Sequence, residues 1–166
     1  MSVPDTYPEP VYLGEPGLVN GRLRRADAEP EIRQANGGAA AYLATGASTN
    51  GQFGLYRWEM AAAPSGPGPH FHRTISEAFY VLSGTIRLFD GADWVDGHAG
   101  DFLFIPEGGL HGFRNESGAP ASMLILFAPG APREDYFETT AALGRGLVLS
   151  DEEKAAFYVR HDTYWR

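Results

Sequence analysis

The sequence predicts an all-β domain, and three observations support this prediction. Short apolar runs alternate with turn residues throughout the middle of the chain, from about residue 39 to residue 130. Within several runs, large apolar side chains recur at every second position, which is the period of a β-strand. The 21 Gly and 12 Pro residues supply tight turns between the runs. Short strands at such close spacing favour a β-sandwich or barrel over a sheet built from βαβ units.

Length and composition indicate one compact domain that binds a small molecule. The 166 residues are 43% hydrophobic and 20% charged, which is enough to bury a core without a metal or disulfide staple. Cysteine is absent, so neither a disulfide framework nor thiolate chemistry is available. The formal net charge of −8 argues against nucleic acid or an anionic membrane as the partner, because both need clustered Lys and Arg.

Nothing in the sequence indicates secretion or a membrane span, and we expect a cytoplasmic protein. Residues 1–10 lack the basic start and following apolar run of a secretory signal. No uninterrupted apolar stretch approaches the ~20 residues that cross a bilayer.

The first segment, residues 1–38, is predicted to be an extended arm. It is rich in Pro, Glu, Arg and Asp and is interrupted by glycines, so we expect one or two short strands at most. Two interpretations remain open, a loosely attached tail or a strand added to the sheet of a partner. In the following barrel segment, residues 39–130, Asn50-Gly51 predicts a tight hairpin with positive φ between two strands.

The strand after this hairpin carries Tyr56 and Trp58 on one face, where they form either core or the lining of a ligand cavity. The Pro- and Gly-rich residues 64–69 exclude regular structure and form a loop. Residues 77–82 have the β-branched and aromatic character of a buried strand, and Gly84 allows a sharp exit. Further short strands are predicted at residues 85–89, 94–96, 101–105, 111–113 and 121–128.

The last segment, residues 131–166, is predicted to be a helical extension packed outside the barrel. Good helix formers run from Glu134 to Leu143, and Gly144 follows as a C-cap. Ser150 and Glu153 have the spacing of a capping box, which predicts a second helix that extends to about Arg160.

Four candidate metal ligands fall in two short segments. In a strand, His70 and His72 project from the same face, because successive side chains alternate. Glu77 and His111 complete a set of ligands for one divalent ion if the fold brings the two segments together. Imidazole and carboxylate ligands suit Fe, Ni, Mn, Co, Cu or Zn and do not select among them. Four protein ligands leave one or two open positions on an octahedral ion, as catalysis requires.

The two segments resemble the two signature motifs of the cupin superfamily. The first reads H-x-H-x4-E-x6-G at His70, His72, Glu77 and Gly84, and the second reads G-x5-P-x-G-x2-H-x3-N at Gly100, Pro106, Gly108, His111 and Asn115. One departure is Pro64, which stands where the family usually has the first Gly of the first motif. The resemblance covers roughly residues 52–128 and implies a double-stranded β-helix, or jelly-roll barrel, whose mouth holds a ligand.

Aromatic and aliphatic residues near the predicted ligands form a candidate substrate pocket. By strand parity we assign five side chains to it: Tyr56, Trp58, Phe79, Val81 and Phe113. The two other histidines, His98 in a predicted turn and His161 after the last helix, are not expected to be ligands.

Three functions remain open. The ligand pattern, the aromatic barrel and the C-terminal helices look similar to small bacterial quercetin dioxygenases, a resemblance that implies Glu77 is both ligand and base for a flavonol-like or other enolic substrate. A metal-assisted isomerase, cyclase or decarboxylase of a polyketide or sugar-like carbonyl compound is the second possibility. A non-enzymatic small-molecule binder is the third, because cupins differ widely in function. We expect a homodimer in each case.

Overall fold

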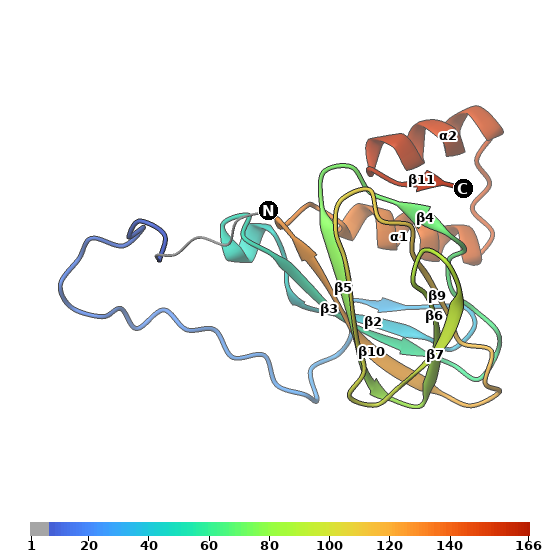
Figure 1. The fold of residues 1–166 in the computed structure, drawn as a ribbon, viewed down its shortest axis with the longest axis horizontal. Coiled ribbons are helices and arrows are strands. Elements are labelled where there is room, and N and C mark those ends of the chain that lie inside the picture. The colour runs from blue at the N-terminus through green and yellow to red at the C-terminus, as the bar shows by residue number, and fades with distance from the viewer. Residues whose placement is uncertain (1–6) are drawn as a thin grey trace.

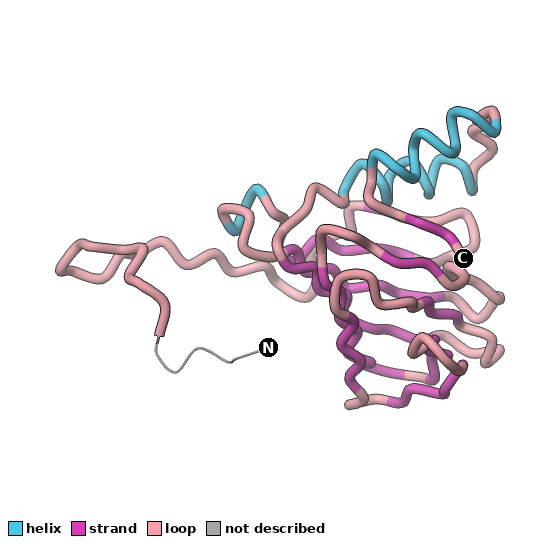
Figure 2. Tube along the Cα trace, turned by 45° about the horizontal axis from the view of Figure 1, so that its top comes forward, coloured by secondary structure: helices cyan, strands magenta, loops and turns pink. Residues whose placement is uncertain are grey.

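A computed structural model describes residues 7–166 and shows mainly antiparallel strands followed by two helices (Figure 1). Residues 1–6, the start of the predicted arm, lie outside the described residues. Between residues 7 and 31 the chain forms no helix or strand and extends away from the sheets (Figures 1 and 2). Within the predicted arm, one short strand, β1 (Ile32–Arg33), pairs with β2.

The strands form one large sheet and two small ones. The six-stranded sheet has the order β1-β2-β3-β10-β5-β8, with β2 (Ala39–Ala44), β3 (Gly54–Met60), β10 (Ala121–Ala128), β5 (Ser76–Ser83) and β8 (Phe102–Ile105). The three-stranded sheet has the order β7-β6-β9, with β7 (Trp94–His98), β6 (Thr85–Phe89) and β9 (Gly112–Arg114). The two-stranded sheet pairs β4 (His70–Phe71) with β11 (Tyr164–Trp165).

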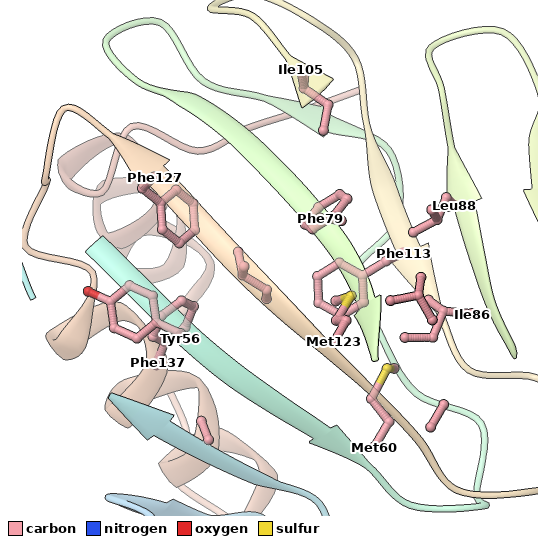
Figure 3. Packing of buried hydrophobic residues seen from close by; sticks show 14 of the residues in the cluster. Tyr56, Met60, Phe79, Ile86, Leu88, Ile105, Phe113, Met123, Phe127 and Phe137 are labelled. Carbon is pink, nitrogen blue, oxygen red and sulfur yellow. The ribbon is translucent and has the colours of Figure 1, made fainter. Parts of the chain in front are cut away.

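The core lies between the inner faces of the six-stranded and three-stranded sheets (Figure 3). In the larger sheet, Ile125 lies opposite Tyr56 on one side and Phe79 on the other, and all three side chains are buried. Ile86 on β6 and Phe113 on β9 belong to the same buried cluster. The predicted all-β cupin-type fold is therefore confirmed, as a sandwich in which the strands of residues 7–166 form separate sheets.

The turn predicted at Asn50-Gly51 is longer than a two-residue hairpin. Both residues have the expected positive φ, 55° and 77°. A 3-10 turn, η1 (Ala47–Thr49), precedes them, and the Thr49 hydroxyl donates a hydrogen bond to the carbonyl oxygen of Phe53 at 2.6 Å. This side-chain bond competes with the strand ladder, which explains why β3 starts only at Gly54.

Both predicted helices are present, as α1 (Glu134–Gly144) and α2 (Asp151–Arg160). The capping box is confirmed: the Ser150 hydroxyl accepts from the Glu153 amide at 3.1 Å, and the Glu153 carboxylate accepts from the Ser150 amide at 2.7 Å. Neither helix within residues 7–166 is long and apolar enough to cross a membrane.

The predicted position of the helices outside the sheets needs a correction for α1. Phe137 of α1 is buried, and its ring lies 5.1 Å from that of Tyr56 (Figure 3). The ring of Trp58 lies 5.0 Å from that of Phe137. Helix α1 therefore covers the part of the inner sheet face that the three-stranded sheet leaves open. This position brings residues of α1 to the candidate site.

Loss of the Tyr56 hydroxyl is expected to lower the free energy of unfolding by about 2 kcal/mol. The hydroxyl donates to the Glu134 carboxylate at 2.7 Å and joins β3 to the first turn of α1. Chemical denaturation of Tyr56→Phe measures this loss. The control is Tyr42→Phe, whose hydroxyl lies 3.3 Å from Glu138 near the surface and should contribute less than about 0.5 kcal/mol. Equal losses in the two variants would contradict the assigned role of Tyr56.

Candidate metal centre

The four predicted ligands converge. One ligand atom from each of the side chains His70, His72, Glu77 and His111 lies within 4.8 Å of the others. All four residues are buried, with exposed fractions of 5% or less. Up to 41 positions of sequence separate them, yet they form one compact cluster of three imidazoles and one carboxylate.

Backbone pairing between the two motifs brings the ligands together. The amide of His70 donates to the carbonyl oxygen of His111, and the amide of His111 donates to that of His70, both at 2.9 Å. Directly opposed side chains in such a pair share one face, so the two imidazole rings lie 4.3 Å apart. The turn before His111 is held to the first motif by the Gly108 amide, which donates to the carbonyl oxygen of His72 at 2.7 Å. Gly108 has a φ of 80°, which favours glycine.

A backbone carbonyl fixes the orientation of each imidazole. Nδ1 of His70 lies 2.9 Å from the carbonyl oxygen of Gly68, and Nδ1 of His111 lies 2.9 Å from the carbonyl oxygen of Gly109. Nδ1 of His72 contacts the backbone carbonyl oxygen of Asp162. Because a carbonyl oxygen only accepts, Nδ1 of each ring must carry the proton. Nε2 of each ring is therefore the atom that can coordinate a cation once it is deprotonated, which is the arrangement that metal-binding histidines use. The donor set thus fits a divalent metal ion.

Burial and mutual charges determine the protonation of the cluster. Burial alone would raise the pKa of Glu77, but the charge of His111 and the hydrogen bonds from His111 (2.7 Å) and His72 (3.1 Å) lower it well below its usual range. Burial would lower the pKa of His111, yet the Glu77 carboxylate raises it overall. Burial, together with the charge of His111, lowers the pKa of His70 to about 4. These shifts favour an ionised Glu77 carboxylate and a neutral His70, and a cation would bind Nε2 of His111 only in its deprotonated form.

Asp162, after α2, fixes the first motif from outside the cluster. Its carboxylate accepts hydrogen bonds from the Arg73 amide at 3.0 Å, the Thr74 amide at 2.8 Å and the Thr74 hydroxyl at 2.7 Å. Its carbonyl oxygen accepts the Nδ1 proton of His72. The backbone φ of 51° at Asp162 is one that Asn and Asp tolerate better than most residues. Asp162 was not among the residues predicted from the sequence.

Asp162→Ala is expected to weaken divalent-metal binding by up to about tenfold, because it removes the acceptor for Arg73 and Thr74 but keeps the carbonyl oxygen that orients His72. Competition with a chromophoric chelator measures the affinity. Asp162→Asn is the matched control, because it keeps one acceptor oxygen and tolerates the positive φ, and it should lose less. An alanine variant that binds metal as tightly as the unmodified protein would contradict the role assigned to Asp162.

A cavity of about 290 Å³ opens beside the cluster, with His70 and Glu77 in its wall. This volume is close to the lower end of the ~300–1,000 Å³ typical of small-molecule sites. Aromatic side chains form half of the rest of the wall: Trp58, Phe113, Phe127, Tyr136, Phe137, Tyr158 and Trp165. The cavity therefore offers flat apolar walls with polar groups at the cluster end.

Two of the five predicted pocket residues, Trp58 and Phe113, line this cavity. The structure places Tyr56, Phe79 and Val81 in the core instead, where each is fully buried. Strand parity identified the inner face correctly, but it could not show where α1 and the three-stranded sheet cover that face. Phe137 covers Tyr56, and Phe113 packs against Phe79 with ring centroids 5.4 Å apart.

Sequence reasoning missed the wall residues that come from the C-terminal segment. Arg133, Tyr136 and Phe137 lie at the start of α1, and Trp165 lies on β11, which pairs with the strand that carries His70. One signal was available. A basic residue at the N-terminus of a helix opposes the helix dipole, so Arg133 is unfavourable there unless it has another role.

Facing antiparallel sheets with a buried cluster of three histidines and one glutamate define a cupin-type protein with a candidate metal site. A family profile described as "Cupin domain" matches residues 56–127, which contain all four clustered residues. Residues 56–127 accordingly match a cupin domain, and this stretch contains both sequence motifs.

Individual proteins are similar to this chain either in sequence or in fold. The chain is 28% identical over 115 residues to quercetin 2,3-dioxygenase from Bacillus subtilis (strain 168), a match that covers 68% of this chain and 33% of that enzyme. The chain thus matches about a third of the length of this relative. In fold it is similar to a predicted oxalate decarboxylase from Thermotoga maritima (TM-score 0.57, 23% identity, 66% of this chain and 99% of that one). It is also similar to an RmlC-like cupin from Shewanella frigidimarina (TM-score 0.53, 22% identity, 65% and 89%).

Proposed function

We propose that this protein is a metal-dependent dioxygenase that acts on a flavonol-like or other enolic small molecule. The observation that carries the proposal is the buried cluster of three imidazoles and one carboxylate at the end of an aromatic cavity. The similarity to quercetin 2,3-dioxygenase supports it independently of the geometry.

In this proposal, His70, His72, Glu77 and His111 hold one divalent transition metal ion. Fe, Ni, Mn, Co, Cu and Zn all accept this combination of ligands. When bound, the ion would lower the pKa of a coordinated substrate hydroxyl group and leave a position open for dioxygen. The backbone carbonyls orient the three rings so that their Nε2 atoms lie in the cluster and can coordinate the ion once they are deprotonated.

The protein itself supplies a proton acceptor and an apolar cavity for the substrate ring. Among the described residues that line the cavity, Glu77 is the only carboxylate, so it is the proton acceptor for the substrate hydroxyl group. Trp58, Phe113 and Phe127 provide flat apolar surfaces for a planar ring and exclude water from it. Dioxygen is the co-substrate, and both of its atoms enter the products.

Oxygen consumption tests the proposal. Protein reconstituted separately with Ni, Co, Mn and Fe is mixed with flavonols, and oxygen uptake and carbon monoxide release are recorded. At least one metal form should consume oxygen in proportion to the flavonol lost. No turnover in any metal form would overturn the proposal. Turnover of a carbonyl compound at the same rate without oxygen would favour an isomerase, cyclase or decarboxylase, and tight binding without product would favour a non-enzymatic binder.

A further inference from the structure

One buried charged residue in the cavity wall, Arg133, does not belong to the cluster of candidate metal ligands. Arg133, the residue before α1, is 3% exposed and lines the cavity. Its guanidinium group donates one hydrogen bond, from Nη1 to the carbonyl oxygen of His161 at 2.6 Å. Its Nε atom is buried and has no partner within residues 7–166. A guanidinium group has five N–H donors, so most of its capacity faces no acceptor of the described chain.

The charged form of Arg133 is energetically unfavourable at this buried position. Burial lowers the pKa of Arg133, and no carboxylate of residues 7–166 lies within ion-pair distance of it. The N-terminus of α1 adds a further penalty, because the helix dipole repels positive charge there. A buried cation with unused donors is compensated when a ligand brings an anionic oxygen to it.

Arg133 lies close to the cluster of candidate metal ligands. Its guanidinium carbon is 4.2 Å from the ring centre of Tyr136 and 5.1 Å from that of Phe127. The ring of Phe127 is in turn 6.2 Å from that of His72. The ring of Phe127 therefore lies between Arg133 and the candidate metal ligands. One planar molecule is long enough to reach from Arg133 to these ligands.

The charges of the cavity also favour an anion. Of the described residues in its wall, Glu77 and Arg133 are the charged ones, and a histidine that coordinates a cation is neutral. Their charges cancel, so a divalent cation at the cluster leaves a net charge of +2 in an aromatic environment. A neutral ligand would leave this charge uncompensated, whereas an organic anion reduces it.

We propose that Arg133 is a specificity-determining residue that binds a carboxylate on a planar substrate while the opposite, hydroxyl-bearing end of that substrate reaches the cluster. This inference rests on the proposed function, because it uses the same cavity and the same bound cation. It narrows the substrate class to planar enolic or phenolic acids whose carboxylate is remote from the chelating oxygen atoms.

A matched pair of probes tests this inference. 3,4-Dihydroxybenzoate has a chelating catechol and a remote carboxylate, and 3,4-dihydroxybenzamide differs only in being neutral. Both are titrated by calorimetry into the protein loaded with zinc, which is redox-inactive and so prevents turnover. We expect the acid to bind at least about tenfold more tightly than the amide, because hydrogen bonds to charged groups are the stronger ones.

Two variants assign the preference to one residue. Arg133→Met should reduce the ratio of the two affinities to about one, and Arg133→Lys should keep part of it, because Lys has the charge but lacks the planar fork. Arg160→Met is the control, because Arg160 is an exposed arginine of α2 that pairs with Asp135 at the surface, and it should leave the ratio unchanged. Circular dichroism checks that each variant is folded.

The inference is overturned if the unmodified protein binds the two probes equally, or binds neither, or if Arg133→Met retains the preference. The comparison in the unmodified protein needs no variant, so a misfolded variant does not remove the test. Failure here is also distinct from failure of the proposed function. A preference for the acid without oxygen consumption would reject only the dioxygenase, whereas flavonol turnover without the preference would reject only the role of Arg133.

Discussion

Replacing His111 with alanine is expected to weaken the binding of a divalent transition metal at least about a hundredfold. Loss of a residue that only orients a ligand costs about tenfold to a hundredfold, and loss of the ligand itself should cost more. His111 has the shortest contact in the cluster, with Nε2 2.7 Å from the Glu77 carboxylate, and its backbone pairs with His70. Equilibrium dialysis against a metal-buffered solution, with elemental analysis of the retained protein, measures the effect.

His98→Ala is the control for this substitution. His98 is an exposed histidine of β7 that shares a 3.3 Å hydrogen bond with Thr85 and lies outside the cluster. The His98→Ala variant should bind metal as tightly as the unmodified protein. Two variants with the same metal content, both folded by circular dichroism, would show that His111 is not a ligand.

Replacing Glu77 with glutamine is expected to lower turnover by about 10²–10⁴-fold, the range that general acid–base groups contribute. Glutamine keeps the shape of the side chain but cannot accept the substrate proton and is a weaker ligand. Steady-state oxygen uptake is measured at a metal concentration that saturates the variant, so that loss of the base is separated from loss of the metal.

Glu107→Gln serves as the matched control, because Glu107 is an exposed carboxylate in the turn of the second motif. The Glu107→Gln variant should keep full activity. If Glu77→Gln retained the same turnover at saturating metal, the substrate proton would be accepted elsewhere, and the chemical role proposed for Glu77 would be wrong.

Local sequence patterns were sufficient to predict the four clustered residues. His70 and His72 lie two positions apart, so a strand places them on one face, and a glycine- and proline-rich turn precedes His111. The cupin resemblance then supplied what local pattern cannot, namely that the two segments lie side by side. The structure shows this pairing directly as two hydrogen bonds between His70 and His111.

The cavity wall could not be predicted in the same way. Helix α1 and strand β11 reach the site through packing between residues far apart in sequence, such as Phe137 against Trp58 and Trp165 opposite His70. Strand parity assigned Tyr56 to the same face as Trp58, and that face is indeed the inner one. Parity carries no information on which part of the face a distant helix covers, and this is why Tyr56 lies in the core instead of the cavity wall.

Anomalous diffraction from crystals grown with nickel or cobalt tests the central claim most directly. We expect one strong peak among His70, His72, Glu77 and His111, with nitrogen and oxygen ligands at about 2.0–2.2 Å and at least one position free of protein atoms. A peak elsewhere, or no peak at a metal concentration that occupies other sites, would show that these four residues do not form the metal site.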